Sequence, residues 1–516
     1  MPERTYRFAP HPANGFLLGL RVPQLLGFVA VGALALGALR LGGLGGLTLA
    51  LALVAATGSV LLLPVRGHTL EQWAPLAARF LLARQTGRAR FQSQRAQVGH
   101  VVELPSDELD PRRASEPSSL PGELAGLEFL EGALVRYEGA RFGVVKDTRA
   151  RTFTAALRVR GGAFALLGPA EREQRLAEYG AVLAALARDD SAVRRVAWIE
   201  RTLPADGDQL GDYLLQAKRP DTTLEDPPEE LVSYLQLIGR AGDVAEEHEL
   251  LFALQIDAQR PSARRAIARM GGGDLGALAV LAGELGQLIE LLDAAAITVK
   301  GVLTRRGVAG AIRDAYDPWG RRERQRRLDH GLLGEDGVAP HTAGPVAREE
   351  HWSHLATDGA LHCTLWAAEW PRIDVRALFL QPLLMDSRAT RTIAMCMELV
   401  GPSKAIRQAE RAATESATEQ HLRARVGQRT SQRQSQRDRA TSQRERELAE
   451  GHAAVRYAAY VTVSVPAGPA DAVAELENDV SRVELEAKRA PLRLERMWGE
   501  QAQAFTFALP LCRGLR

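Results

Sequence analysis

The residues whose types best suit metal chemistry lie together in "HWSHLATDGALHC", residues 351–363. Three histidines and a cysteine of this stretch, His351, His354, His362 and Cys363, are residue types that bind zinc. In a β-hairpin, however, the alternation of side chains would send His351 and His354 to opposite faces of the sheet. The same alternation separates His362 from Cys363. The pattern therefore favours surface histidines on strands over a metal site.

A nucleotide site would need a glycine-rich phosphate loop. The sequence contains no Gly-Lys pair, which excludes the phosphate loop whose lysine contacts the nucleotide. Gly271, Gly273 and Gly276 fit the G-x-G-x-x-G spacing ahead of an expected helix. The residues before them, "SARRAIARM", are not the apolar strand that a dinucleotide fingerprint requires. We therefore interpret these glycines as a helix-entry loop and predict no cofactor.

The other reactive residue types form no recognisable constellation. Asp and Glu are abundant, but no pair stands out as a general acid and base, and no residue stands out as an activated nucleophile. The three cysteines, Cys363, Cys396 and Cys512, are too widely separated for a disulfide framework or a zinc ligand set. The sequence therefore predicts buried thiols in a reducing compartment and a protein that is not an enzyme.

The clearest charge pattern is the arginine stripe in "RVGQRTSQRQSQRDR", residues 425–439. Its arginines recur every four residues and share a slowly turning helix face: Arg425, Arg429, Arg433 and Arg437. The stripe lies within residues 402–452, for which we predict one long polar helix of about 75 Å. Because Ala440 is the only apolar side chain between residues 427 and 447, this helix cannot pack a stripe on a core and must protrude.

Three interpretations of the arginine stripe stay open. A solvated surface is the commonest role of such charge runs and is favoured. The alternatives are contact with an acidic surface of a partner protein and contact with nucleic acid. The net charge of +2 gives no basic excess typical of a dedicated nucleic-acid binder. No aromatic side chains interleave with the arginines, as single-strand binding would favour.

Two apolar stretches near the N-terminus, residues 22–39 and 44–64, contain no charged residue. At about 1.5 Å per residue, each can cross a hydrocarbon core of about 30 Å. Only Arg40 and a few further residues separate them, so we predict a tight two-helix transmembrane hairpin. A cleaved signal peptide is the alternative for the first stretch, but a second apolar stretch follows it at once.

Arginines on both sides of this hairpin predict its orientation. Those that precede or follow it are Arg4, Arg7, Arg21, Arg66, Arg79, Arg84, Arg88 and Arg90. The positive-inside rule then places both ends of the hairpin, and hence the N- and C-termini, in the cytoplasm. The expected location is the cytoplasmic membrane.

Residues 69–91, "TLEQWAPLAARFLLARQTGRARF", have two interpretations. In the first, an interfacial amphipathic helix turns four apolar side chains to lipid and its arginines to headgroups; these side chains are Trp73, Leu76, Phe80 and Leu81. In the second, an ordinary helix packs on its own domain.

Residues 104–124 are rich in Pro, Ser and charged residues, and we interpret them as a linker.

Strand and helix patterns alternate along the rest of the chain. "GARFGVVKD" and "RTFTAALRVRG" predict a hairpin, followed by the helix "AEREQRLAEYGAVLAALARD" and the strand "AVRRVAWIERTL". Strand–helix–strand units recur, and the last ends in a predicted closing strand, "AFTFALPL", residues 504–511. We predict an α+β fold of ferredoxin-like (βαβ plait) domains with helices on one face of the sheet.

The order of these parts resembles a known family. The segment "RYAAYVTVSVPA", the helix after it and the final "FTFALPL" resemble the end of the N-terminal, non-catalytic domain of the large ATPases of conjugative type IV secretion systems. Leu509-Pro510 matches a Leu-Pro just before the nucleotide-binding domain of those ATPases. The N-terminal hairpin is similar to their small two-helix inner-membrane partner. The whole layout resembles actinobacterial conjugation or type IV secretion membrane proteins that join the two.

This resemblance implies a non-catalytic, membrane-anchored scaffold subunit of a type IV secretion or conjugation-like machine. The sequence ends at Arg516, where the ATPase motor domain would begin, so the expected partners are a separate secretion ATPase and other membrane subunits. Whether the protein forms a homo-oligomer stays open. The alternatives are a core membrane component of a type VII secretion system and a membrane-tethered nucleic-acid-binding protein acting through the arginine stripe.

The sequence thus predicts four parts, which a chain of 516 residues can accommodate. They are a cytoplasmic N-terminus over residues 1–21, a transmembrane hairpin over 22–65, an amphipathic helix and linker over 66–128, and a cytoplasmic α+β region over 129–516 that carries the long polar helix.

Overall fold

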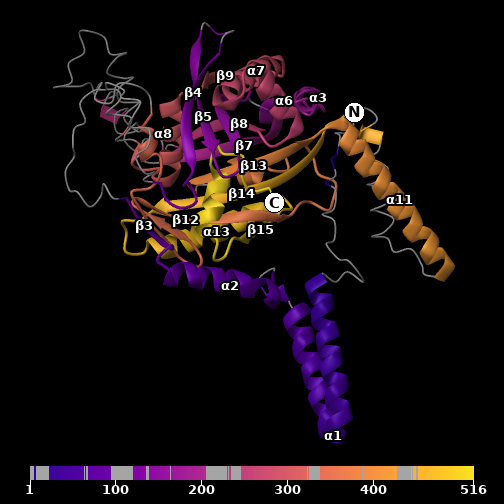
Figure 1. Ribbon diagram of the computed structural model, residues 1–516. Helices are drawn as coiled ribbons and strands as arrows, with labels where there is room; N and C mark the ends of the chain where they lie inside the picture. Colours follow the sequence, from indigo (N-terminus) through magenta and orange to yellow (C-terminus); the bar gives the residue numbers. More distant parts are fainter. Residues whose placement is uncertain are drawn as a thin grey trace, which may run out of the picture.

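The computed structural model describes residues 5–6, 8, 22–62, 64–65, 68–93, 120–134, 137, 139–162, 164–204, 229, 232–233, 246–321, 324, 337–385, 389–426, 443, 446–448 and 451–515. These residues form a mixed α+β body around one large sheet, from which two helical elements extend (Figure 1). The α+β class predicted from the sequence is confirmed.

The body is organised by an antiparallel sheet of 13 strands. Along its main path the order is β3-β10-β11-β12-β14-β13-β7-β8-β6-β5-β4, while β15 pairs with β12 and β9 pairs with β6. The strands are β3 (Arg90–Gln92), β4 (Leu127–Leu134), β5 (Ala140–Asp147), β6 (Thr152–Arg160), β7 (Val193–Pro204), β8 (Glu246–Asp257), β9 (Thr298–Val302), β10 (Ala347–Glu350), β11 (Leu355–Thr357), β12 (Ala360–Glu369), β13 (Arg391–Val400), β14 (Ala454–Pro466) and β15 (Arg493–Arg496). A separate pair, β1 (Pro64–Val65) and β2 (His68–Thr69), lies outside this sheet.

One connectivity occurs twice in the sheet. In the first unit, β6, helix α3 (Pro169–Leu186), β7, β8, helix α7 (Gly273–Ala294) and β9 follow one another, and the strands lie in the order β9-β6-β8-β7. In the second unit, β12, helix α10 (Gln381–Met385), β13, β14, helix α13 (Ala472–Arg489) and β15 give the order β15-β12-β14-β13. Pairing of β7 with β13 joins the two units into one continuous sheet.

Helices cover both faces of this sheet. Leu157 and Phe252 belong to the buried cluster that contains the core residues of α3 and α7. Their neighbours Ala156 and Ala253 belong to the cluster on the opposite face, under helices α8 (Arg305–Tyr316) and α14 (Gln501–Phe505). The remaining short elements are α6 (Pro261–Arg269) and the 3-10 turns η4 (Phe164–Leu166), η5 (Pro340–Thr342) and η6 (Thr506–Ala508). The prediction of helices on one face was wrong, because strands such as β6 are buried on both sides.

The predicted closing strand over residues 504–511 was also wrong. Residues Gln501–Ala508 form α14 and η6, and the strand that closes the second unit is β15. Gln501 is fully buried and donates hydrogen bonds from Nε2 to the carbonyl oxygens of Thr364 (3.2 Å) and Met497 (2.8 Å). Because β15 already occupies the place beside β12, the apolar residues that follow are buried as a helical turn against the sheet face.

Helix α7 is, among the described residues, the single helix long and apolar enough to cross a membrane by length and composition. It packs in the core, however, since Leu281, Leu285 and Leu288 are fully buried under the first unit of the sheet. Its apolar character is therefore explained by its position in the fold.

The helical segment α1 (Val22–Leu62) contains two shorter apolar runs, Gly27–Arg40 and Gly45–Ala55. A Cβ atom at Gly46 would lie 2.1 Å from the carbonyl oxygen of Ala38, whereas eight residues of straight helix extend about 12 Å. The segment therefore turns back on itself, and Figure 1 draws it as two helical runs below the body.

Residues on both sides of α1 contact the same body. Before it, the backbone N–H of Tyr6 donates to the carbonyl oxygen of Val375 (2.8 Å), and Val375 N–H donates back to Tyr6 (2.9 Å). The ring of Phe8 packs against Trp370 with centroids 5.0 Å apart. After α1, helix α2 (Leu70–Gln85) lies along the body, and β3 then pairs with β10.

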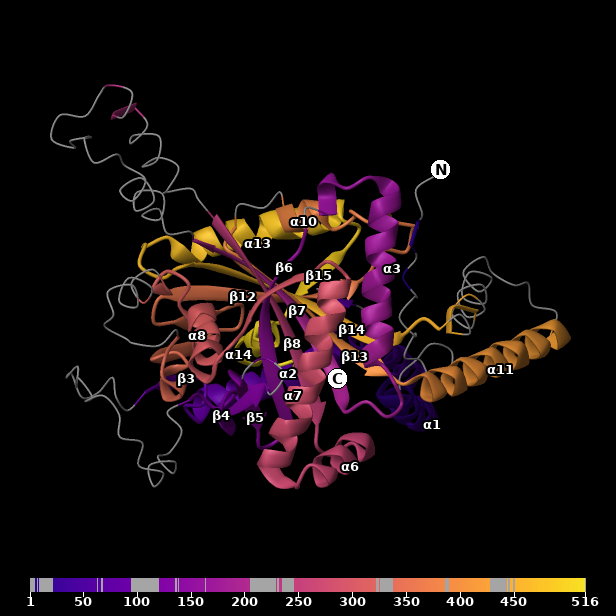
Figure 2. The same cartoon turned by 90° about the horizontal axis from the view of Figure 1, so that it is seen from above.

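Helix α11 (Pro402–Val426) extends away from the body (Figures 1 and 2). It is anchored at its base, where Ala405 packs with Val400 and Ala454. The predicted long polar helix is confirmed over the described residues Pro402–Val426, which protrude as expected.

Candidate functional site: the contact surface of helix α2 and a buried ion-pair network

Helix α2 rests on an aromatic surface of the body, here called the α2 contact surface. Trp352, in the turn between β10 and β11, lies 5.7 Å from Trp73 and 5.1 Å from Phe80 between ring centroids. Trp498, in the turn after β15, lies 6.5 Å from Trp73. Trp73 and Phe80 are seven residues apart, so two helical turns place them on one face of α2. Aromatic pairs at these distances contribute packing energy beyond simple area burial.

The two turns of this surface are fixed to each other by Gly499. Its N–H donates to the carbonyl oxygen of Trp352 at 2.9 Å. Gly499 has φ +68°, and a Cβ atom there would lie 2.5 Å from the Trp352 ring. A side chain at this position would therefore displace Trp352 as well as strain the backbone.

Ion pairs continue the contact along α2 and β3. Arg79 lies 3.8 Å from Glu500, and Arg90 donates to Glu349 at 2.8 Å. The N–H of Thr69 at the start of α2 donates to the side-chain oxygen of Gln72 at 3.0 Å, which fixes the first turn. These contacts fasten the segment that follows α1 to the edge of the sheet.

The structure tests the two interpretations of residues 69–91. Phe80 is 7% exposed and, like Trp73, packs on the body, so these two side chains do not face lipid. Leu81 and Leu82 lie on the other face and are 56% and 59% exposed. The face of α2 that carries Trp73 and Phe80 therefore packs on its own domain, as the second interpretation expects. The opposite face exposes apolar side chains.

The histidines beside Trp352 are arranged differently from the prediction. His351 and His354 do not point to opposite faces, because their rings stack with centroids 4.4 Å apart in a turn. Burial, together with the neighbouring His351, lowers the pKa of His354 to about 4.

His362 and Cys363 are fully buried on opposite faces of β12, so the prediction of surface histidines was wrong here. His362 Nδ1 lies 2.8 Å from Ser464 Oγ, and Nε2 lies 3.2 Å from the carbonyl oxygen of Tyr316. Burial lowers the pKa of His362 to about 4, and burial raises the pKa of Cys363 to about 12. All three cysteines are buried, as predicted. In the part of the chain that the structure describes, no group of three His, Cys, Asp or Glu side chains is placed to hold a metal ion.

The buried His362 predicts a loss of stability on acidification. Its pKa is about 4 when folded against a reference value of 6.5, so between these values the unfolded chain binds more protons and stability falls as pH falls. Between pH 7 and pH 5 this amounts to about 2 kcal/mol. We expect His362→Asn to have a shallower pH dependence of the urea unfolding midpoint over this range than the unchanged protein. Equal slopes in the two proteins would contradict the assignment.

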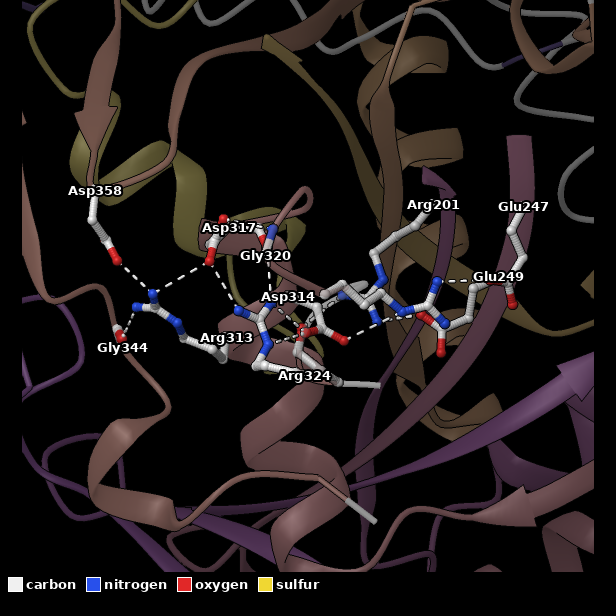
Figure 3. A network of polar contacts seen from close by, with 12 residues as sticks. Arg201, Glu247, Glu249, Arg313, Asp314, Asp317, Gly320, Arg324, Gly344 and Asp358 are labelled. Carbon is white, nitrogen blue, oxygen red and sulfur yellow. Dashed lines mark hydrogen bonds and ion pairs between the residues drawn. The ribbon is translucent and has the colours of Figure 1, made fainter. Parts of the chain in front are cut away.

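A network of arginines and carboxylates lies on the α8 face of the sheet (Figure 3). At its centre the buried Arg201 of β7 pairs with the buried Glu249 of β8, and Arg201 also donates to the carbonyl oxygen of Ala311 in α8 at 2.6 Å. Arg158 of β6 donates to the same glutamate at 2.9 Å. These bonds link the neighbouring strands β6, β8 and β7 to one another and to α8.

The network continues around the end of α8. Arg324 donates to Asp314 at 2.8 Å and to Asp317 at 2.9 Å. Arg313 pairs with Asp358 in the turn between β11 and β12 and donates to the carbonyl oxygen of Gly344 at 2.9 Å. The first unit of the sheet is therefore bonded to the turn that precedes the second.

The electrostatics of this network are those of paired, ionised groups. Burial alone would raise the pKa of Glu249, but Arg201 and Arg158 outweigh it and hold the pKa at about 2. For Asp317, burial is likewise outweighed by hydrogen bonds from Arg324 and the Gly320 N–H, which lower its pKa. Carboxylates held ionised in this way are weak proton acceptors. The arrangement fits a structural joint better than acid–base catalysis.

The residues singled out from the sequence lie in separate places. Gly271, Gly272 and Gly273 have positive φ and form the turn between α6 and α7, and a Cβ atom at Gly276 would lie 2.6 Å from the carbonyl oxygen of Ile267. These glycines serve the entry and close packing of a helix, as predicted. Of the arginine stripe, Arg425 belongs to the last turn of α11, and three residues lie outside the described part of the chain: Arg429, Arg433 and Arg437.

Sequence reasoning missed the residues that build both features. The signal for the α2 contact surface was the apolar spacing of Trp73 and Phe80 together with Trp352, which lies within the histidine stretch. The signal for the network was Glu249 in the strand "EEHELLFALQID", because alternation places it on the same side of the strand as the apolar residues Leu251 and Ala253.

The chain was also compared with protein-family models and with curated proteins, and it matches none of them.

Proposed function

We propose that this protein is a non-catalytic, membrane-anchored scaffold subunit of a type IV secretion or conjugation-like translocation machine. In this proposal α1 is a two-helix anchor in the cytoplasmic membrane, and the α+β body lies on the cytoplasmic side and docks a separate ATPase. One observation supports the proposal that α1 is a membrane anchor with both ends on the same side. Residues before α1 (Tyr6, Phe8) and after it (α2) contact the same body, so both ends of α1 lie on one side of any membrane that it enters.

The exposed side chains of α1 support its placement in a bilayer. Leu34, Leu36 and Leu51 are 62%, 65% and 62% exposed, and they are not covered by the body. Exposed leucines along a helical segment whose only charged residue is Arg40 suit hydrocarbon better than water. A segment of 41 residues that turns back between Ala38 and Gly46 gives two runs of about 30 Å, the thickness of the hydrocarbon core.

The strand orders of the two units support ferredoxin-like plaits. Numbered along the chain, each unit of four strands has the spatial order 4-1-3-2 with antiparallel neighbours. Two such plaits in one sheet are consistent with the resemblance to the non-catalytic domain of the secretion ATPases. Because the sequence contains no Gly-Lys pair, we propose that nucleotide hydrolysis belongs to the partner subunit.

The proposal predicts a definite membrane topology. In intact cells, a cysteine introduced by Arg40→Cys is expected to react with a membrane-impermeant maleimide, because it lies at the turn of the anchor. The matched variant Met270→Cys, 58% exposed in the body, is expected to react only after the cells are permeabilised. The three native cysteines are buried and give little background. Labelling of position 270 in intact cells would overturn the proposed topology.

The scaffold role is tested by the partner. In complexes purified from native membranes, a photoreactive ATP analogue is expected to label a separate polypeptide, with ATP hydrolysis present in the complex and absent from this chain alone. ATP hydrolysis by the purified chain itself would overturn the proposal.

A further inference from the structure

Helix α2 has a second face that is turned away from the body, here called the α2 outer face. Along the helix, its exposed residues alternate with the residues that pack on the body. They include Ala74, Ala78, Leu81 and Leu82. Leu81 and Leu82 are among the exposed large apolar side chains of the described chain, at 56% and 59%. An amphipathic helix with one face on its own domain normally presents polar residues on the other.

Basic residues border the α2 outer face. Arg79, Arg84 and Arg88 are all exposed, and Arg79 keeps 75% of its side-chain surface exposed although it lies near Glu500. The described exposed residues of α2 and its following turn contain no acidic side chain. Two carboxylates of the body border these arginines: Glu500 lies near Arg79, and the pKa of Glu349 is lowered by Arg90 and, less strongly, by Arg84. The exposed side of the helix itself combines leucines and arginines, which is the composition of a helix at the boundary between headgroups and acyl chains.

The position of α2 in the molecule matches this composition. Figure 1 shows α2 lying across the lower side of the body, with the two runs of α1 extending from its end in the direction away from the body. If α1 crosses a bilayer, α2 then lies in the plane of its surface. The aromatic contacts to Trp352 and Trp498 hold the opposite face of α2 on the body, so the outer face points toward the lipid side.

We propose that the α2 outer face binds the headgroup layer of an anionic bilayer and thereby fixes the orientation of the body on the membrane. Leu81 and Leu82 enter the upper acyl region, and Arg84 and Arg88 contact lipid phosphates. The proposal rests on the proposed function, because it takes α1 to be the membrane anchor. It adds a second membrane contact that sets how the sheet is presented to a docked partner.

Depth-dependent fluorescence quenching of the full chain in nanodiscs tests this contact. Single cysteines are introduced by Leu82→Cys, Leu36→Cys or Met270→Cys and labelled with bimane, while the buried native cysteines stay unlabelled. Lipids brominated near the headgroup end of the acyl chain serve as quenchers. We expect loss of bimane emission at position 82 in nanodiscs that contain phosphatidylglycerol. We expect no loss at position 270, which lies on the exposed end of α6 in the body.

The charge dependence is tested by Arg84→Gln together with Arg88→Gln, in the Leu82→Cys background. Each arginine near an anionic surface is expected to change the ratio of lipid-contacting to lipid-free states about fivefold. The quenching at position 82 should therefore weaken in the double variant and in nanodiscs of neutral phosphatidylcholine. Quenching that is equal in neutral and anionic lipid would overturn the proposal.

The label at position 36 distinguishes a failure of the proposed α2 contact from a failure of the proposed α1 anchor. If position 36 is quenched by bromine at the centre of the bilayer and position 82 is not quenched, the α2 outer face is free or belongs to a protein partner, and only this inference fails. If position 36 is not quenched either, α1 does not enter the bilayer, and the anchor of the proposed function fails with it.

Discussion

Replacing Glu249 with glutamine is expected to lower the free energy of unfolding by about 3–5 kcal/mol. The side chains of Arg201 and Glu249 are 2% and 4% exposed, so the variant leaves a buried guanidinium without its counter-charge. Glutamine has nearly the shape of glutamate, and the loss therefore reports charge rather than a cavity. The Nε atom of Arg201 is already buried without a hydrogen-bond partner, so little capacity for compensation remains. Urea unfolding followed by tryptophan fluorescence measures the change.

Two controls separate the buried pair from ion pairs in general. Arg141→Gln removes a pair with Glu131 whose side chains are 76% and 36% exposed, and should cost at most about 1 kcal/mol. The double variant Arg201→Met, Glu249→Leu removes both buried charges and should recover most of the stability. A loss in Glu249→Gln no larger than that in Arg141→Gln would show that the network contributes little.

The strands and long helices could be predicted because their local patterns agree with their environments. "GARFGVVKD" and "RTFTAALRVRG" were predicted as a hairpin, and β5 and β6 pair antiparallel, with Val145 opposite Thr154. The helices now labelled α3, α7 and α13 were also placed correctly, since each carries an apolar face long enough to fix its period. In these segments propensity and burial point to one structure.

Other elements depended on tertiary context that a local pattern does not contain. The run "AFTFALPL" is apolar except for Thr506, and such a short run fits a buried strand and a buried helical turn equally well. Its conformation is decided by β15, which takes the place beside β12. The apolar residues of "DVRALFLQPLLM", residues 374–385, predict a helix over the whole stretch, but only Gln381–Met385 forms one.

The candidate site was the least predictable part for a physical reason. Trp73 and Trp352 meet only because β3 pairs with β10, and nothing near either residue encodes that pairing. The burial of His362 likewise follows from α8 and α14 covering a face of β12 that was expected to be exposed. What the sequence did contain was the amphipathic spacing of α2, which left two orientations open until its partner surface was known.

The aromatic contact of α2 leads to the second large expected effect. Phe80→Ala should weaken the attachment of α2 to the body by about 3 kcal/mol, because a nearly buried ring is lost and the Trp352 turn cannot fill its space. In detergent, hydrogen exchange of the α2 amides should then be faster by roughly 100-fold, since α2 opens from the body more often. The core strands should keep their protection, which localises the effect.

Leu82→Ala is the matched control on the same helix. Leu82 is 59% exposed and turned away from the body, so in detergent its truncation should leave the exchange of α2 nearly unchanged. The contrast between the two variants depends on which face of α2 contacts the body, because both remove a large apolar side chain from one helix. Equal acceleration in both would mean that the attachment of α2 does not depend on which of its faces is truncated, and faster exchange in Leu82→Ala than in Phe80→Ala would reverse the assignment of the two faces.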